Sequence, residues 1–75
     1  MVNVMTLSKA VMNVLVYVNN YPRNTFAELG FEMGISGVAV RKHCLTLKAA
    51  GYVDWTRKSR SLVITKAGHA ALRKK

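Results

Sequence analysis

Two glycines, Gly30 and Gly34, are the feature of this sequence that most constrains its fold. They occupy the fifth and ninth places of the stretch 26–45. Glycine in the middle of a helix costs about 1 kcal/mol relative to alanine, so Gly30 implies a close approach by another element. Gly34 suits a turn position with a positive φ angle. The spacing predicts two short helices joined by a tight turn at residues 34–36, which is a helix-turn-helix.

The polar residues around these glycines predict where the two helices begin and end. Thr25 followed by Glu28 has the spacing of a capping box, and Ser36 is a good N-cap for the second helix. That second helix is expected to run to Ala50 and to stop at Gly51. The buried side of the motif is expected to consist of apolar residues, namely Phe26, Leu29, Met33, Ile35, Val40, Cys44 and Leu47.

The opposite face of the second helix combines cations with apolar side chains. Helical angles place on it Val38, Arg41, Lys42, Leu45 and Ala49, with Lys48 near the flank. A face that is only solvated would carry fewer apolar residues. Val38 could touch a thymine methyl group in a DNA major groove, whereas Leu45 has no clear role on DNA.

A first helix is expected ahead of this motif, from a cap at Thr6 or Ser8 to about Val18 or Asn19. Its core stripe is apolar and consists of Leu7, Val11, Val14, Leu15 and Val18. A second apolar stripe, Met5, Met12 and Val16, falls on the face away from the core. Either a short domain simply exposes this surface, or the stripe is the subunit interface of a homodimer.

Positive charge is concentrated in the second half of the chain. Twelve Lys and Arg residues stand against three Asp and Glu residues, which gives a net charge of +9. Residues 1–40 hold two basic and two acidic residues, whereas residues 41–75 hold ten basic residues and Asp54. A polyanionic partner follows from this asymmetry, and nucleic acid is the commonest polyanion. An anionic membrane surface would instead favour a basic amphipathic helix.

After Gly51 the apolar period changes from helical to two. This period predicts two strands of a hairpin. In the first, Val53 and Trp55 alternate with Asp54 and Thr56, and in the second, Leu62 and Ile64 alternate with Ser61, Val63 and Thr65. The turn between them, residues 57–60, contains three cations. Such a tip beside a helix-turn-helix is placed to touch the DNA backbone or minor groove, although it could also be a solvated turn that aids solubility. Residues 65–75 return to a helix whose packing residues are expected to be Ala67, Ala70, Ala71 and Leu72.

The 75 residues predict a single domain, 1–75, with little room for a deep active site. No cofactor or metal is expected, because His43 and Cys44 are adjacent and point about 100° apart on a helix, while His69 lies far along the chain. With three acidic residues and no glycine-rich phosphate loop, the chain is not expected to be an enzyme. The lone cysteine fits a reducing cytoplasm, and the most apolar run, residues 14–18, is too short to span a membrane.

The order of helix, helix-turn-helix, basic hairpin and short helix resembles the winged helix-turn-helix superfamily over nearly the whole chain. Within it, Ile35-Ser36, Val38, His43, Leu45, Leu47 and the run 48–53 look like the DNA-binding domains of LexA-type and MarR-type repressors. The segment 64–72 is similar to the strand-to-helix piece that follows the wing in MarR-type regulators. The resemblance implies an α+β, mostly helical fold with a three-helix core, a two-stranded basic wing and a short C-terminal helix.

The resemblance also implies sequence-specific binding of double-stranded DNA by a repressor-like transcriptional regulator, commonly a homodimer. In such repressors the positions of Ser36, Val38, Ala39, Arg41 and Lys42 read bases or adjacent phosphates. The full set of residues expected on DNA is Thr25, Ser36, Gly37, Val38, Ala39, Arg41, Lys42, Lys48, Arg57, Lys58, Ser59 and Arg60. The small size would suit a prokaryotic or viral regulator.

A protein-interaction module is the alternative function. Winged helices also serve as docking domains, and an acidic partner such as the transcription machinery would attract a +9 domain as DNA does. Exposed Val38, Leu45 and the stripe Met5, Met12 and Val16 fit this alternative better. RNA binding is a weaker third possibility, because no exposed aromatic pair is expected on a sheet.

Overall fold

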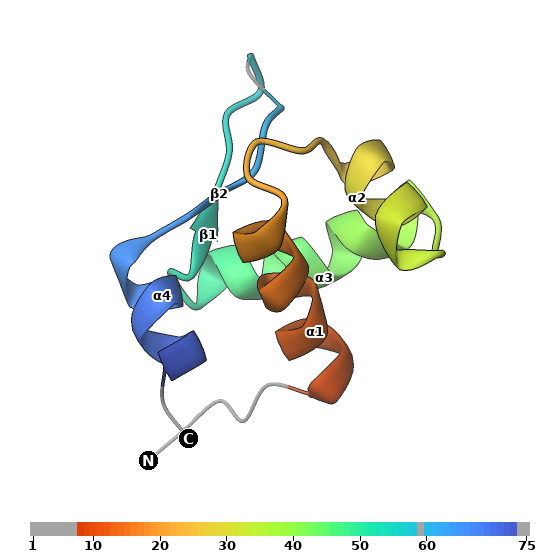
Figure 1. Ribbon diagram of the computed structural model, residues 1–75. Helices are drawn as coiled ribbons and strands as arrows, with labels where there is room; N and C mark the ends of the chain where they lie inside the picture. The colour runs from red at the N-terminus through yellow and green to blue at the C-terminus, as the bar shows by residue number, and fades with distance from the viewer. Residues whose placement is uncertain (1–7, 59, 74–75) are drawn as a thin grey trace.

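The computed structural model describes residues 8–58 and 60–73, which form four helices and a two-stranded antiparallel sheet (Figure 1). The elements in chain order are α1 (Lys9–Asn20), α2 (Phe26–Met33), α3 (Gly37–Ala49), β1 (Val53–Asp54), β2 (Val63–Ile64) and α4 (Lys66–Arg73). The fold is therefore small, α+β and mostly helical, as the apolar periods predicted. Within the described ranges, no helix combines the length and the apolar character needed to cross a membrane.

Each of the first three helices begins at a side-chain cap. The Ser8 hydroxyl accepts a hydrogen bond from the Val11 amide at 3.2 Å, and the Ser36 hydroxyl accepts one from the Ala39 amide at 3.1 Å. Thr25 and Glu28 form the reciprocal capping box. These caps confirm the predicted helix starts, since each cap satisfies an amide that the first helical turn leaves without a partner. The other predicted cap, Thr6, lies outside the described residues, as do Met5 and Leu7.

The turn between α2 and α3 depends on its two glycines. Gly34 has a φ angle of 73°, in the left-handed region. A Cβ atom on Gly30 would lie 2.6 Å from the Ile35 carbonyl oxygen and 3.1 Å from the Gly37 nitrogen. Both predicted reasons for glycine are therefore confirmed, and α3 begins directly against the last turns of α2.

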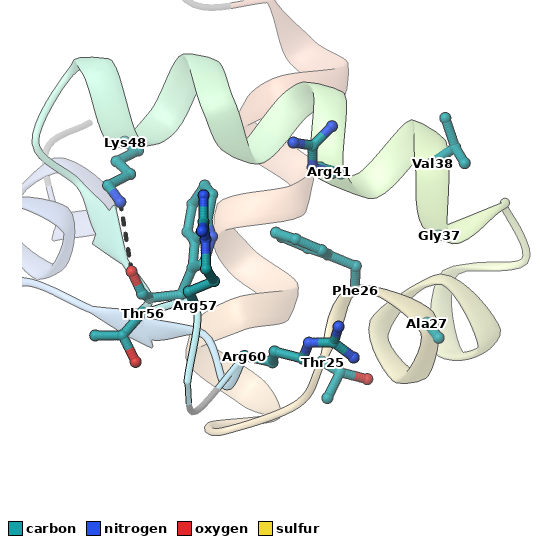
Figure 2. A pocket seen from close by; sticks show the side chains of 11 residues that line it. Thr25, Phe26, Ala27, Gly37, Val38, Arg41, Lys48, Thr56, Arg57 and Arg60 are labelled. Carbon is teal, nitrogen blue, oxygen red and sulfur yellow. Dashed lines mark hydrogen bonds between the residues drawn. The ribbon is translucent and has the colours of Figure 1, made fainter.

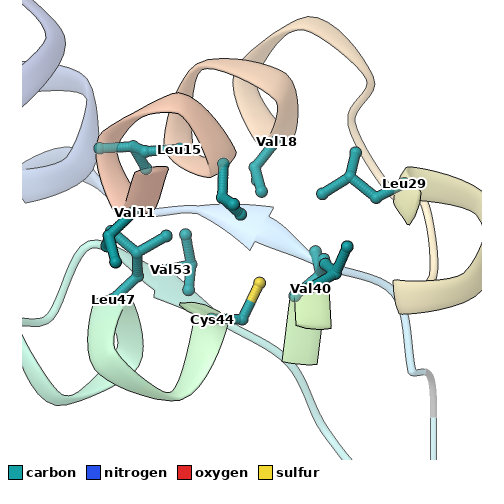
Figure 3. Close-up of a cluster of buried hydrophobic side chains, with 10 residues drawn as sticks. Val11, Leu15, Val18, Leu29, Val40, Cys44, Leu47 and Val53 are labelled. Atoms are coloured by element: carbon teal, nitrogen blue, oxygen red, sulfur yellow. The ribbon is translucent and has the colours of Figure 1, made fainter. Parts of the chain in front are cut away.

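One apolar core joins α1, α2, α3 and the hairpin (Figure 3). Its fully buried side chains are Val14, Leu15, Val18, Leu29, Val40, Cys44, Leu47, Val53 and Leu62. Two predicted placements are wrong. Ile35 is 38% exposed because it lies in the turn. Its backbone carbonyl faces Gly30, and its side chain does not fill that space. Met12 packs against the core instead of facing away from it, because its flexible side chain reaches the side of the buried stripe.

The hairpin pairs over fewer residues than the alternation predicted. Val53 pairs with Ile64 and Asp54 with Val63, and the strands end there. Leu62 instead bonds to the chain before α2, where its amide donates to the Asn24 carbonyl and its carbonyl accepts from the Arg23 amide, both at 3.0 Å. The prediction that Trp55 and Thr56 continue the first strand is therefore wrong, because the opposite segment is already paired with residues 23–24.

Helix α4 closes the fold by packing Ala71 and Leu72 against the core. Gly68 is buried and contacts the Tyr52 carbonyl so closely that a Cβ atom would collide with it. The prediction that Ala67 and Ala70 also pack is wrong: both are exposed, because the helix faces the core with the side that carries Gly68, Ala71 and Leu72.

Replacing Gly30 with alanine tests the approach of α2 to α3. Alanine normally stabilises a helix interior by about 1 kcal/mol over glycine, but here its Cβ would meet backbone atoms. We expect Gly30→Ala to lower the free energy of unfolding by about 2 kcal/mol, measured by denaturant titration. The control is Ala70→Gly, at an exposed position inside α4, which should cost about 1 kcal/mol. Stabilisation by Gly30→Ala would contradict the packing described.

The buried thiol of Cys44 makes stability depend on alkaline pH. Burial raises its pKa from 9.0 to about 12. As the pH rises, the thiol ionises in the unfolded chain before it ionises in the folded protein. The contribution of the buried thiol to the free energy of unfolding is therefore complete below pH 9 and is lost as pH rises toward 12. We expect the native chain to lose about 1 kcal/mol more than Cys44→Ala between pH 9 and pH 10. Unfolding titrations at the two pH values measure this difference, and parallel losses in both proteins would refute it.

Candidate nucleic-acid interface

An open groove of about 900 Å³ lies between the start of α2, one face of α3 and the hairpin tip (Figure 2). Its lining comes from three segments that are distant in sequence, and it consists of Thr25, Phe26, Ala27, Gly37, Val38, Arg41, Lys48, Trp55, Thr56, Arg57 and Arg60. The groove is therefore a product of the fold rather than of any local motif.

The charge of the groove has one sign. Arg41 and Lys48 project from α3, while Arg57 and Arg60 come from the hairpin tip, and the lining contains no Asp or Glu. In Figure 2 the side chain of Arg60 extends toward the start of α2, across from Arg41. Four cations around one concave surface concentrate positive potential in it. An extended anion could contact both walls of such a groove.

The groove brings together seven of the residues predicted to bind DNA: Thr25, Gly37, Val38, Arg41, Lys48, Arg57 and Arg60. Ser36, Ala39, Lys42 and Lys58 lie outside its lining. The Ser36 hydroxyl serves as the N-cap of α3, which gives it a structural role. Ser59 lies outside the described residues.

Two aromatic rings form the apolar floor of the groove. Phe26 and Trp55 meet edge to face, with ring centroids 5.1 Å apart and an interplanar angle of 83°. Both rings also pack against the core. Sequence reasoning placed Phe26 in the core but missed it as a lining residue, since nothing local in the sequence indicates that Trp55 will lie against it.

Lys48 braces α3 against the hairpin. Its Nζ lies 3.4 Å from Asp54 Oδ1, donates to the Trp55 carbonyl at 3.4 Å and lies 4.5 Å from the centroid of the Trp55 ring. Asp54 in turn accepts a hydrogen bond from the Trp55 amide at 2.8 Å. Lys48 thus has partners within the chain, so among the four cations of the groove lining Arg41, Arg57 and Arg60 are the most available to an outside anion.

Large apolar side chains lie exposed in and around the interface. Val38, which lines the groove, is 79% exposed, and Leu45 on the same helix is 47% exposed. Both were predicted on this face, and their exposure is confirmed. Phe31 on α2 is 84% exposed, although the sequence reasoning gave it no role.

The apolar stripe predicted as a dimer interface is smaller than expected. Val16 is 38% exposed and, with half-buried Met12, borders a shallow depression that also includes Lys9, Ala10 and Asn13. Since Met12 also packs against the core, less of the stripe is available to a partner.

Among residues 8–58 and 60–73, no group of three or more His, Cys, Asp or Glu side chains gathers as a metal site would require. Comparisons of the chain with protein-family models, with curated proteins and with solved structures found no match. The argument for a function therefore rests on the geometry and charge of the groove.

Truncating Lys48 tests the brace. We expect Lys48→Ala to lower the free energy of unfolding by about 1 kcal/mol, the sum of an exposed ion pair and an exposed cation–π contact. It should also shift the emission of Trp55, the chain's single tryptophan, to longer wavelength, because the ring loses its cover. Lys42→Ala, at an exposed position of the same helix, is the control. Equal emission shifts in the two variants would rule the brace out.

Proposed function

We propose that this chain is a winged helix-turn-helix protein that binds double-stranded DNA in a sequence-specific manner as a repressor-like transcriptional regulator. In this proposal α3 is the recognition helix, which enters the major groove, and the β1–β2 hairpin with its basic tip is the wing. The arrangement of α2, a glycine turn and α3 beside a basic hairpin supports it. A recognition helix needs one exposed face, and Val38, Arg41, Lys42 and Leu45 are exposed along α3.

The convergence of cations on the groove carries this proposal. Arg41 lies on one wall while Arg57 and Arg60 lie on the other, with no acid in the lining. The phosphate backbone is the polyanion that can follow such a groove, and phosphate contacts supply most of the non-specific affinity of a DNA-binding protein. This arrangement is hard to explain as solubility alone, because solubility does not require cations from separate segments to face one another.

The groove residues would divide between positioning and reading. Arg57 and Arg60 would hold phosphates, which fixes the orientation of the protein without reading sequence. Arg41 would contact a guanine edge or a phosphate, and Val38 would meet a thymine methyl group. Gly37, at the first turn of α3, lets the start of α2 lie close to α3, because a Cβ atom there would be 3.3 Å from the Ala27 Cα. A homodimer that pairs through Val16 and its neighbours on α1 would read a palindromic site.

A titration of duplex binding against salt tests the proposal. If about five phosphates are neutralised, log K should fall against log salt with a slope near −4.5. Arg57→Ala should reduce the slope by about 0.9 and weaken binding to all sequences equally. Arg41→Ala should also relax sequence preference, by about 1–3 kcal/mol at one position. Lys9→Ala, on α1 and outside the groove, is the matched control. A slope near zero would overturn the proposal.

A second candidate function is a protein-interaction module for an acidic partner. The observation that favours it is the exposure of Val38 and Leu45 on α3, since apolar side chains fit a protein surface better than a phosphate backbone. Selection of binding sites from random duplexes, at stated salt, separates the two functions. Recovery of a common sequence supports the regulator, whereas uniform recovery together with binding to an acidic protein supports the module.

A further inference from the structure

The DNA-binding proposal leaves the outer face of α2 without a role. Phe31 is the most exposed large apolar side chain of the described residues, at 84%. Glu28 and Glu32 lie on the same face and border the same shallow depression as Phe31. An exposed aromatic ring beside carboxylates is suited to a cationic partner, because the ring face and the carboxylates both attract positive charge.

The acids of this chain are distributed unevenly. Of the three in the sequence, Asp54 is paired with Lys48, whereas Glu28 and Glu32 both lie on α2. The outer face of α2 is therefore the acidic surface of a strongly basic protein.

The outer face of α4 has the complementary character. Lys66, Ala70 and Arg73 follow one another at helical spacing on the side opposite the buried Gly68, and all three are exposed. Two cations flank a small alanine there. A ring such as that of Phe31 could lie over Ala70. Lys66 and Arg73, on either side, could then contact the ring face and the neighbouring carboxylates.

The two faces cannot meet within one molecule. In Figure 1, α2 and α4 lie at opposite ends of the fold, with α3 running between them. A contact between α2 and α4 must therefore join two copies head to tail. Because each copy keeps one free face of each kind, such a contact repeats along a row instead of closing into a dimer.

We propose that neighbouring copies bound on DNA contact one another through the outer face of α2 on one copy and the outer face of α4 on the next. This inference rests on the proposed DNA binding and adds a consequence to it, namely cooperative occupancy of adjacent sites. The partner is a second copy of this chain, in an orientation set by charge. Two α2 faces would place carboxylates against carboxylates, so a symmetric contact is disfavoured.

DNA is needed for this contact to persist. Two eight-residue helices, each about 12 Å long, bury far less than the roughly 1,200 Å² that stable complexes require. Two free copies also repel each other, because each carries a charge of +9. Phosphates neutralise that charge and hold the copies at high local concentration, so a weak contact becomes effective.

Binding to duplexes of two lengths tests the proposal. A duplex of about 12 base pairs, roughly 40 Å long, serves as the short probe, and one of about 48 base pairs has room for neighbours. We expect adjacent binding on the long duplex to be favoured about tenfold, as one cation–π contact and two exposed ion pairs allow. Phe31→Ser should remove most of this preference and leave the short-duplex affinity unchanged. Val63→Ser, at another exposed apolar position, is the control.

A charge exchange tests the orientation. Glu32→Lys and Arg73→Glu should each abolish the preference for neighbours, and the two together in one chain should restore it. Each preference is the ratio of long-duplex to short-duplex affinity, which removes the effect of altered net charge. Failure of the double variant to recover the preference, or undiminished preference in either single variant, would overturn the proposal.

Crosslinking without DNA separates this proposal from the proposed function. Copies with Glu32→Cys and copies with Ala70→Cys are mixed at high concentration, while the buried Cys44 stays unreactive. We expect disulfides between unlike copies in preference to like ones. If the disulfide between a Glu32→Cys copy and an Ala70→Cys copy forms but the protein binds neither duplex, only the proposed DNA binding is refuted. If the short duplex is bound normally, but neither this disulfide nor the preference for the long duplex is found, only the contact between α2 and α4 is refuted.

Discussion

The close approach of α2 and α3 is the constraint on which the rest of this structure depends. The Ile35 carbonyl and the Gly37 amide lie where a side chain on residue 30 would be, and the Gly37 Cβ position is 3.3 Å from the Ala27 Cα. Ala27 and Gly37 both line the groove, so this approach sets the groove's width at one end. At the other end, Lys48 holds α3 to Asp54 and Trp55. The cations of the hairpin tip thereby keep a defined place relative to Arg41.

Much of this arrangement could be predicted from the sequence, because its causes are local. The caps at Thr25 and Ser36 act over three residues, and the buried positions of α3 follow the helical period. The requirement for glycine at residue 34 follows from a single dihedral angle. Even the cationic side of the molecule was predictable, since ten of the twelve basic residues come after residue 40.

What could not be predicted depends on segments that are distant in sequence. The pairing of Leu62 with Asn24 shortens the hairpin, and the alternating pattern of residues 53–56 does not indicate this pairing. The contact of Phe26 with Trp55 likewise joins the start of α2 to the hairpin, and no sequence motif links these two segments. Lys48 was expected on DNA, and its position on α3 was correct. The partners of Lys48, which are Asp54 and Trp55, depend on where the hairpin begins. Helical angles alone do not predict that position.

The exposed side chains of α3 bear most directly on what the groove recognises. A surface that only binds phosphate has no physical reason to place a valine, 79% exposed, at the start of α3 and inside a cationic groove. Exposed apolar area is unfavourable in water by roughly 25 cal/mol per Å², so a valine among arginines is suited to a partner that has apolar groups beside charges. The DNA major groove has both, in thymine methyl groups and flanking phosphates. Val38 therefore favours reading of sequence over simple attraction, if DNA is the partner. Leu45 lies outside the lining of this groove, so the same argument does not extend to it.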